Sequence, residues 1–427
     1  MAFVALTRIV PRRLEGVVRA LMGVEAVTIL QGPRAVGKST LLSALASETG
    51  GQVVDLDDLG TREAVSQDPA PFFSGPSTVF LDEFQHVPEV LDVIKAELNR
   101  DARPGRFVIT GSTNYLSLPT AARTLTGRAH LVGVLPLSQG EIDEVTEDFA
   151  EALVSDPAGL SSATGGGEVG RQEYAVRAVR GGFPEPLRRA RSADRARWFD
   201  DYVELVIERD VIELSRVRQR RQLPLLLARL AAQTGQVLNI RAAAEDIGME
   251  PTTAENYTRL LEAVFLVRRL PAWGTTLGSR VGSHPKVHLA DPGLAARLLR
   301  LTEQKLLAAS AQALSEFGHL LETFAVGEIT KQLGWLEEPV VIGHWRTHDS
   351  DEVDLVIERE DGMVTGVEVK AGSRVGWRDA RSLRKLRDRL GSRFLGGVVL
   401  YTGPRAYSMP DSIQVIPLQR LWGAGGV

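Results

Sequence analysis

One stretch of the sequence has the residue types and spacing needed to bind a nucleoside triphosphate. Residues 32–39 match the pattern G-x-x-x-x-G-K-[ST] at every position, between an apolar run at 27–30 and a helical stretch at 40–47. Glycines allow backbone N–H groups to close around phosphates, and the N-terminus of the following helix adds a favourable dipole. We expect Lys38 to contact the β- and γ-phosphates of ATP and the Ser39 hydroxyl to bind Mg²⁺. The predicted nucleotide-binding residues are Gly32, Pro33, Arg34, Ala35, Val36, Gly37, Lys38, Ser39 and Thr40.

Two carboxylates further along the chain complete the expected site. Asp82 and Glu83 directly follow the apolar run 79–81. A buried strand that ends in acidic residues delivers them to the carboxyl edge of a parallel sheet, where ligands bind. We expect Asp82 to bind Mg²⁺ through water and Glu83 to orient or activate the attacking water. The alternative is a strand end that carries two solvated acids.

Polar residues after the next predicted strand are candidates for sensing the γ-phosphate. Thr110, Ser112 and Asn114 compete for this role, and an ordinary loop with hydroxyl side chains fits the sequence almost as well. Arg123 and Arg128 follow, and either could be an arginine finger that acts on a neighbouring subunit. We prefer Arg128, which predicts a homo-oligomer, whereas the alternative is a surface arginine.

A second set of carboxylates lies near the C-terminus, in a predicted β-hairpin. Polar and apolar residues alternate through 352–358 and 366–370, and residues 360–362 (Glu-Asp-Gly) predict a three-residue loop with a left-handed glycine. In that register Asp354 faces Glu368, and Glu352 faces Lys370. A two-residue turn would instead set Asp354 against an apolar valine, so the shared polar face favours the first register.

Two opposed carboxylates repel each other unless a positive charge lies between them. A divalent cation with oxygen ligands is the natural candidate, with Asp354 and Glu368 as ligands, the Val369 carbonyl as a further one, and Lys370 beside a bound water. This arrangement resembles the core of PD-(D/E)XK nucleases, and the resemblance implies that Glu322 on the preceding helix completes the metal site. The alternatives are an exposed face with ordinary charges, or an inherited core that no longer cuts.

Two surfaces are candidates for nucleic-acid contact. The segment 371–393 carries eight Lys or Arg and two Asp, and on a helix its basic residues would form a stripe able to follow a phosphate backbone. A predicted recognition helix near residue 255 carries further polar groups, although Glu255 is among them. Both surfaces have alternatives that involve no nucleic acid. The first could be a solvated charged face, and the second a structural or partner-binding helix. The candidate nucleic-acid-binding residues are Thr252, Asn256, Arg259, Arg374, Arg378, Arg381 and Lys385, with Arg389 on the same basic stripe.

The elements that must position these residues change in order along the chain. Before a Gly- and Ser-rich stretch at 155–170, which we expect to be a flexible loop, short apolar strands alternate with helices, which predicts a parallel α/β sheet. The next region is helical, and 237–261 predicts helix, turn, helix, with Thr252 or Thr253 capping the second helix and a strand at 264–270. The strands predicted for the first region are Ala26–Leu30, Gln52–Leu56, Ser77–Leu81, Arg106–Thr110 and His130–Leu135.

After about residue 301 the order is α/β again. We expect one long helix at 303–333, and a basic helix at 374–390 between the predicted strands. Those strands are Val340–Trp345, Glu352–Glu358, Met363–Lys370 and Gly396–Tyr401. The chain is thus expected to contain a P-loop ATPase domain (1–154), a helical and winged-helix domain (171–300) and a restriction-endonuclease-like α/β domain (301–427).

The motifs together resemble the predicted AAA+ superfamily ATPases of bacteria and archaea that carry a C-terminal domain of unknown function. The resemblance runs from the P-loop through LDEFQHVP, FVITGST, LTGR, LPLSQGE and GGFPEP to the tail motif with Glu352 and Asp354, and covers nearly the whole chain. It continues through Tyr202, the Arg209-Asp210 pair, and Lys286 with the Leu-Ala-Asp-Pro-Gly run around Asp291. It implies an AAA+ module, a winged-helix segment and a nuclease-like tail.

Composition narrows the function classes. The 427 residues are 44% hydrophobic and 24% charged with a net charge of −4, so nucleic-acid binding must come from local basic patches. The chain has no cysteine, which excludes disulfides, cysteine-ligated metals and a cysteine nucleophile. It has no membrane-length apolar run and no secretory signal pattern, which fits a cytoplasmic protein. We therefore expect a Mg²⁺-dependent AAA+ ATPase coupled to DNA. The alternative is a nucleotide-switched regulatory or toxin–antitoxin-like protein that binds a protein partner and cuts nothing.

Overall fold

The computed structural model describes residues 5–117, 125–162, 169–211, 220–276, 284–308, 310–349 and 351–423. The N-terminal region is built on a parallel sheet whose strands, within these residues, have the order β2-β3-β4-β1-β5. All five strands predicted from the sequence are confirmed, with ends that differ by at most a few residues. Their bounds are β1 Val27–Gln31, β2 Gln52–Asp55, β3 Val79–Asp82, β4 Phe107–Gly111 and β5 Ala129–Gly133.

Helices cover both faces of this sheet, which explains why its central strands are continuous apolar runs. One face packs Leu30, Phe80 and Val108 against α1 and α2, and the other packs Leu81 and Ile109 against α5. The carboxyl ends of β1, β3 and β4 consequently open at one edge. The elements of this region are α1 Leu14–Met22, α2 Lys38–Thr49, α3 Leu59–Gln67, α4 Ala70–Phe73, η1 Phe84–His86, α5 Val90–Leu98 and η2 Tyr115–Ser117.

The stretch expected to be a flexible loop at 155–170 begins with regular structure. Residues Pro157–Ser161 form the turn η3, and Leu160 is buried there. This turn packs against strands of the C-terminal sheet, while the helix before it, α8, packs against α19. The apolar Leu160 explains the difference, because it is buried in the large core shared with the C-terminal strands. The neighbouring elements are α7 Gln139–Asp143, α8 Phe149–Ser155, α9 Arg171–Arg180, α10 Pro184–Leu187, α11 Ser192–Leu205 and η4 Val206–Val211.

A second region combines helices with a small sheet of strand order β6-β8-β7. The predicted helix–turn–helix is present as α14 and α15, but the predicted cap is wrong. Glu250 is the N-cap residue of α15, and Pro251 takes the first helical position, where its missing N–H costs nothing. The bounds are η5 Arg220–Gln222, α13 Leu223–Ala232, β6 Gln236–Val237, α14 Ile240–Glu245, α15 Pro251–Ala263, β7 Val267–Leu270 and β8 Lys286–Leu289.

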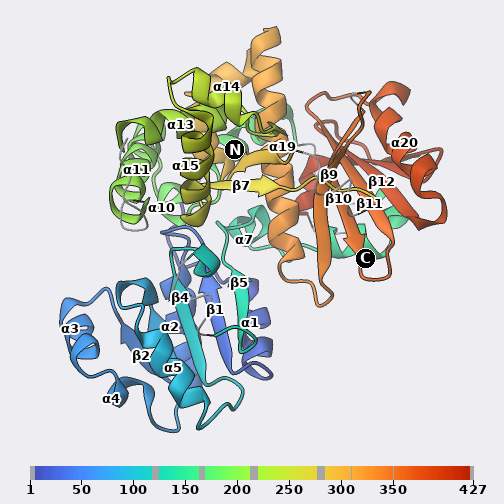
Figure 1. Cartoon of the computed structure of the whole chain (residues 1–427). Coiled ribbons are helices and arrows are strands. Elements are labelled where there is room, and N and C mark those ends of the chain that lie inside the picture. The colour runs from blue at the N-terminus through green and yellow to red at the C-terminus, as the bar shows by residue number, and fades with distance from the viewer. Residues whose placement is uncertain are drawn as a thin grey trace.

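The long helix expected at 303–333 is two helices. The first, α18 (Glu303–Leu307), ends where Ala308 adopts an extended conformation, and Ser310 then caps α19 (Ala311–Leu333) by accepting from the Ala313 N–H. Figure 1 shows α19 running between the small sheet and the C-terminal sheet. It contacts both α17 (Pro292–Leu298) and strands β10 and β11.

The C-terminal sheet has the strand order β13-β14-β12-β11-β10-β9 among the described residues. Its four predicted strands are confirmed, whereas β13 and β14 were not predicted. The basic helix begins later than expected: Gly376 is extended, a turn follows, and α20 starts at Arg381. The bounds are β9 Val340–Arg346, β10 Glu352–Arg359, β11 Val364–Lys370, η6 Trp377–Ala380, α20 Arg381–Leu390, η7 Gly391–Arg393, β12 Phe394–Tyr401, β13 Tyr407–Met409, β14 Ile413–Pro417 and η8 Leu418–Leu421.

Candidate functional site

The P-loop lies between the end of β1 and the start of α2, as its sequence predicts. Its backbone requires unusual conformations, because Ala35 and Gly37 both have positive φ, at 60° and 94°. A side chain at Gly32 is excluded by contact, since a Cβ there would lie 2.0 Å from the Val134 carbonyl oxygen. The loop is therefore closely packed against the chain that leaves β5.

Lys38 is buried beneath this loop and is held by it. Its Nζ donates to the carbonyl oxygens of Gly32 and Pro33 at 3.0 and 2.8 Å. Burial lowers the pKa of Lys38 to about 8, against the attraction of the Glu83 carboxylate. These two carbonyls are the groups that the phosphates of a bound nucleotide would replace as partners of the ammonium.

Asp82 lies at the end of β3, beside the start of α2. Its carboxylate accepts hydrogen bonds from the hydroxyls of Ser39 and Thr110, and burial raises its pKa. Two hard oxygen groups, the Ser39 hydroxyl and the Asp82 carboxylate, are thus already in contact. That donor set fits Mg²⁺, which prefers oxygen ligands and is commonly shared with phosphates.

Glu83 occupies a strained position next to Asp82. Its φ is 51°, in the left-handed region that non-glycine residues rarely adopt, and such outliers concentrate at functional sites. Its carboxylate contacts Gln85 and accepts from the Ser112 hydroxyl at 3.1 Å. Burial alone would raise its pKa, but the Lys38 ammonium and the two hydrogen bonds lower it. Glu83 is therefore a buried carboxylate held in its charged form.

The three sensor candidates occupy different places. Thr110 is bonded to Asp82 and Ser112 to Glu83, so both support acidic side chains of the site. Asn114 lies away from these carboxylates, and its backbone N–H donates to the Ala263 carbonyl at the end of α15. Ser112 and Thr110 are therefore placed to respond to a nucleotide, whereas Asn114 joins the sheet to the second region.

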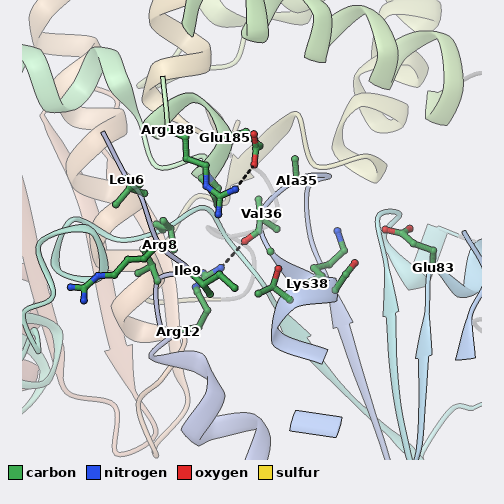
Figure 2. Close-up of a pocket in the computed structure, with 16 residues that line it drawn as sticks. Leu6, Arg8, Ile9, Arg12, Ala35, Val36, Lys38, Glu83, Glu185 and Arg188 are labelled. Carbon is green, nitrogen blue, oxygen red and sulfur yellow. Dashed lines mark hydrogen bonds and ion pairs between the residues drawn. The ribbon is translucent and has the colours of Figure 1, made fainter. Parts of the chain in front are cut away.

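The structure adds a second wall to this site that sequence reasoning missed. The pocket beside Lys38 and Glu83 is also lined by Leu6, Ile9 and Val10 from the N-terminal segment and by Pro184 and Arg188 around α10 (Figure 2). The N-terminal segment is tied to α10 because the Leu6 N–H donates to the Leu187 carbonyl at 3.1 Å. Apolar residues ahead of the P-loop strand were the available signal, but only tertiary docking brings them to the pocket.

Arg12 fixes this N-terminal wall to the P-loop. Its guanidinium donates to the Val36 carbonyl at 2.7 Å (Figure 2). It also donates to the Leu135 carbonyl at 2.7 Å and pairs with Glu141 at 3.1 Å. Arg12 thus joins three segments that surround the phosphate loop. A change in the conformation of the P-loop must therefore be accommodated by the N-terminal segment as well.

Two of the motifs that carry the family resemblance, GGFPEP and the Leu-Ala-Asp-Pro-Gly run around Asp291, are in contact. Asp291 is completely buried, and its carboxylate accepts from the Gly182 N–H at 2.7 Å. A Cβ on Gly181, whose φ is 68°, would lie 1.9 Å from the Asp291 Oδ1. The Gly182 carbonyl in turn accepts from Leu137, a residue that lines the nucleotide pocket. The glycines of GGFPEP are therefore required for close packing between the pocket wall and the second region.

The side chain of Arg34, a residue predicted to bind nucleotide, contacts the helical region. Its Nε lies 2.6 Å from the Asp210 carboxylate, and its carbonyl accepts from the Tyr202 hydroxyl at 3.4 Å. Burial opposes the charge of Arg34, but the bond to Asp210 raises its pKa. The predicted family motif around Tyr202 and Asp210 therefore lies against the P-loop.

Arg128, the preferred arginine-finger candidate, lies away from the nucleotide site of its own chain. Arg128 precedes β5, whose first residue pairs with the first residue of β1, so it is at the edge of the sheet opposite the P-loop. Its guanidinium donates to the Asn99 side chain at 2.7 Å and is exposed. This position suits only action on a neighbouring subunit, so the finger stays a prediction. Arg123 lies outside the described residues.

One candidate nucleic-acid surface lies on α15. Thr252, Asn256 and Arg259 are all exposed on α15, at spacings of four and three residues that place them on one face. Glu255 beside them is paired with both Arg259 and Arg269. Its carboxylate is therefore neutralised within the protein.

The basic stripe is shorter than expected. Arg374 and Arg378 precede α20, so only Arg381, Lys385 and Arg389 are on the helix. Arg381 and Lys385 both pair with the buried Asp351 carboxylate. Part of the positive charge is therefore balanced by an acid that the sequence pattern did not reveal.

The predicted hairpin register is confirmed. Leu355 pairs with Val367 and Glu358 with Val364, and Gly362 in the loop is left-handed with a φ of 79°. Asp354 and Glu368 consequently share a face of the sheet, and burial, together with the Asp354 carboxylate, raises the pKa of Glu368 and of Glu322. Burial, partly offset by Lys370, raises the pKa of Glu368 to about 7.

The partners of these acids differ from the expected ones. Lys370 pairs with Glu368 at 2.7 Å rather than with Glu352. Asp354 accepts from the Val369 N–H at 2.9 Å and from the ammonium of Lys286 at 2.9 Å. The same ammonium contacts the carboxylates of Glu322 and Glu352. It therefore pairs with two of the expected metal ligands, Asp354 and Glu322, but not with Glu368.

This arrangement does not fit the predicted metal site at Asp354, Glu368 and Glu322. Within the described residues, no group of three or more His, Cys, Asp or Glu could hold a metal ion. One oxygen, Glu368 Oε1, is buried without a hydrogen-bond partner. Glu322 Oε1, Glu368 Oε2 and both oxygens of Asp354 are engaged by Lys286, Lys370 or backbone, so a divalent cation would have to displace these partners.

Three segments of the chain match known families. Residues 24–143 match a family described as an AAA domain, residues 171–305 match a domain of unknown function (DUF8612), and residues 317–421 match another (DUF4143). Two uncharacterized proteins, from Mycobacterium bovis and Mycobacterium tuberculosis, are each 27% identical over 404 residues, which cover 94% of this chain and 82% of each relative. A Walker-type ATPase of Pyrococcus abyssi matches 70% of this chain and 98% of its own at 16% identity, with a TM-score of 0.40.

The segment similar to AAA domains contains the P-loop, Asp82 and Glu83, which supports an ATPase-like domain at the N-terminus. The other two matched families carry no assigned activity. Among the described residues, no helix is long and apolar enough to cross a membrane.

Proposed function

We propose that the protein is a Mg²⁺-dependent ATPase of AAA+ type that couples ATP binding and hydrolysis to contacts with DNA. The observation that carries the ATPase part is the convergence of Lys38, Asp82 and Glu83 at the carboxyl edge of the parallel sheet. Each is buried, and each is held by neighbouring residues in a position suited to phosphate, Mg²⁺ or water.

The proposed mechanism assigns one task to each of these side chains. Lys38 would exchange its two carbonyl partners for the β- and γ-phosphates, and Ser39 and Asp82 would hold Mg²⁺, which would neutralise phosphate charge. Glu83, fixed by Gln85 and Ser112, accepts a hydrogen bond from the attacking water and so orients it. Arg128 of a neighbouring subunit would stabilise the negative charge of the transition state, which requires self-association.

Single-turnover and steady-state ATP hydrolysis, combined with binding of a fluorescent ATP analogue, test this assignment. Glu83→Gln should bind ATP with Mg²⁺ but hydrolyse it at least about 100-fold more slowly, as expected for loss of a general base. Lys38→Ala should weaken binding itself. Glu89→Gln, which changes an exposed acid six residues away, is the matched control and should hydrolyse at the wild-type rate. Wild-type hydrolysis by Glu83→Gln would remove Glu83 from the mechanism.

The arrangement of the second region supports the DNA part of the proposal. Its elements follow the order α13, β6, α14, α15, β7, β8, and β8 lies between β6 and β7 in the sheet. A helix–turn–helix followed by a two-stranded antiparallel hairpin is the arrangement of a winged helix. In such folds the second helix enters the major groove. In this protein the second helix is α15, which would present Thr252, Asn256 and Arg259 to the DNA.

The order of elements in the C-terminal region supports the proposal of a nuclease-like fold. Helix α19, strands β9 to β11, helix α20 and the parallel strand β12 follow the helix–strands–helix–strand order of the nuclease core that the sequence resembles. Arg374, Arg378 and Arg389 remain exposed near α20. We propose that they contribute phosphate contacts, with Arg381 and Lys385 sharing their charge with Asp351.

A DNA-binding titration separates the proposed function from its alternative. Fluorescence anisotropy with a duplex at low salt should show binding that is weakened by Arg259→Ala and little changed by Arg197→Ala, an exposed arginine on α11. ATP hydrolysis should rise when DNA is added. No DNA affinity at low salt, together with DNA-independent hydrolysis, would contradict the DNA part.

The alternative is a nucleotide-switched regulatory protein that binds a protein partner and cleaves nothing. One observation favours it over a nuclease: the Lys286 ammonium occupies the place between Glu322, Glu352 and Asp354. Because this observation concerns cleavage alone, it leaves the ATPase and DNA-binding proposals unaffected. Incubation of supercoiled plasmid with the protein and Mg²⁺ or Mn²⁺, with and without ATP, tests it: nicked or linear product would contradict the alternative.

A further inference from the structure

The most tightly organised charge cluster outside the nucleotide site is centred on Lys286. This side chain is completely buried. Its Nζ lies 2.7 Å from Glu322 Oε1, 2.5 Å from Glu352 Oε1 and 2.9 Å from Asp354 Oδ1. An ammonium has three N–H donors and no acceptor, so three oxygen partners satisfy it completely.

The members of this cluster come from different parts of the chain. Lys286 begins β8 of the small sheet, whereas Glu322 is on α19 and the other two acids are on β10. The backbone reinforces the contact nearby, because the Trp273 N–H donates to the His344 carbonyl at 2.6 Å and the His344 N–H donates to the Pro271 carbonyl at 2.9 Å. The chain that follows β7 is thus joined to the edge strand β9 of the C-terminal sheet.

The other charged groups around the cluster do not compete for its centre. Arg346 lies 3.7 Å from the second oxygen of Glu352, on the exposed side. Lys370 is paired with Glu368. His319, on the same helix as Glu322, is half-buried, and burial lowers its pKa, which favours its neutral form. Lys286 is therefore the cation that the three acids share.

We propose that Lys286 is a tethered cation that takes the place of a divalent metal ion in the carboxylate site of the C-terminal domain. Two of the acids that would hold a metal in a nuclease of this fold, Glu322 and Asp354, instead join Glu352 in holding the small sheet against the C-terminal sheet. The site accordingly binds no divalent cation and cuts no phosphodiester in this arrangement. This inference does not depend on the ATPase or DNA-binding proposals.

The first test is Mn²⁺ binding by the nucleotide-free full-length protein, followed by the electron paramagnetic resonance signal of free Mn²⁺. Wild type and Asp354→Asn should bind Mn²⁺ equally weakly, because Lys286 excludes the ion from the acids. Binding to wild type that is lost in Asp354→Asn would overturn the proposal, since Asp354 would then be a metal ligand beside Lys286. This comparison needs no change at Lys286.

The second test removes the tethered cation. Lys286→Met should lower the thermal midpoint Tm by about 5–15 °C, because it leaves buried acids without their counter-charge. Added Mn²⁺ should restore much of this loss, and the restoration should disappear in Lys286→Met/Asp354→Asn. Lys305→Met, at an exposed lysine on α18, is the matched control and should show neither effect. If Lys286→Met is folded and Mn²⁺ does not raise its Tm, the acids are not a cation site and the proposal fails.

Discussion

Asp291 offers a prediction in which the sign of a pH effect follows from burial. This aspartate is completely buried and accepts the N–H groups of Gly182, Gly293 and Leu294 at 2.7, 2.8 and 3.1 Å. Burial raises its pKa from 3.8 to about 6, even though Lys331 and the three N–H groups favour the charged form. The folded protein therefore holds a proton on Asp291 between about pH 4 and 6, where the unfolded chain does not.

The perturbation is Asp291→Asn, which keeps the size of the side chain and removes its titration. Because the pKa of Asp291 is higher in the folded state, its protonation contributes to the free energy of unfolding of the wild type. This contribution is fully present below about pH 4 and is lost as pH rises through about 6. The difference between 3.8 and about 6 corresponds to about 3 kcal/mol. The side-chain amide of Asp291→Asn also places an NH₂ group, which cannot accept a hydrogen bond, opposite the Gly182 N–H. A buried N–H left without an acceptor costs roughly 1–3 kcal/mol.

These two effects act in opposite directions, so the order of stability of wild type and variant should reverse as pH rises. Near pH 4, Asp291→Asn should be less stable than wild type by roughly 1–3 kcal/mol. Above pH 6.5 it should be about as stable as wild type or more stable, since it avoids burying a charge. The measurement is urea denaturation followed by circular dichroism, at half-unit pH steps from 4 to 7.5. Asp246→Asn, at an exposed aspartate of the same region, is the control.

Two outcomes would refute this reasoning. A constant difference between Asp291→Asn and wild type over the whole range would show that Asp291 does not take up a proton on folding. A difference that grows in favour of wild type as pH rises would show that the charged carboxylate is the stabilised form. In that case Lys331 and the N–H groups would outweigh burial.

Three further predictions follow from the same structure. Gly181→Ala should destabilise the protein by at least about 2 kcal/mol and weaken ATP binding, because the added Cβ meets the Asp291 carboxylate at 1.9 Å. Gly170→Ala, whose Cβ meets nothing within 4 Å, should cost at most about 1 kcal/mol for its place at the N-cap of α9 and should leave ATP binding unchanged in the same assays. Arg128→Ala should lower kcat by about 10³ or more without changing ATP affinity, and mixing it with Lys38→Ala should restore part of the hydrolysis if the arginine acts between subunits. Arg259→Ala should reduce the slope of log affinity for DNA against log salt by about one, and an unchanged slope would show that this arginine contacts no phosphate.

The parts of the fold that the sequence predicted are those fixed by local rules. The P-loop is contiguous, so the pattern at residues 32–39 determines both its chemistry and its place between strand and helix. The hairpin register was predictable because a slip of one residue would move Asp354 and Glu368 to opposite faces of the strands. The five strands of the first sheet were predictable for a related reason, since burial on both faces leaves continuous apolar runs.

The features that were missed depend on contacts between distant segments. Lys286 is 68 residues from Asp354, and no periodicity in either segment indicates that they meet. The same holds for Asp351, which balances Arg381 and Lys385, and for the N-terminal residues that line the nucleotide pocket. The break before α19 was missed for a local reason: extended backbone at Ala308 and Ser310 interrupts an otherwise continuous helical pattern.

Helix α19 gives the two sites a common support. Near its end, the Lys331 ammonium donates to the Leu137 carbonyl at 2.9 Å, and Glu328 accepts from the Gln139 N–H at 2.8 Å. Leu137 lines the nucleotide pocket, whereas Glu322, six residues before Glu328 and so about 9 Å along the same helix, is bonded to Lys286. A movement of the pocket wall at Leu137 must therefore either break these bonds or displace α19. Displacement of α19 would change the distance between Glu322 and Lys286, because the lysine is anchored in a different sheet. The contact between the small sheet and the C-terminal sheet is thus mechanically linked to the segment that closes the nucleotide pocket.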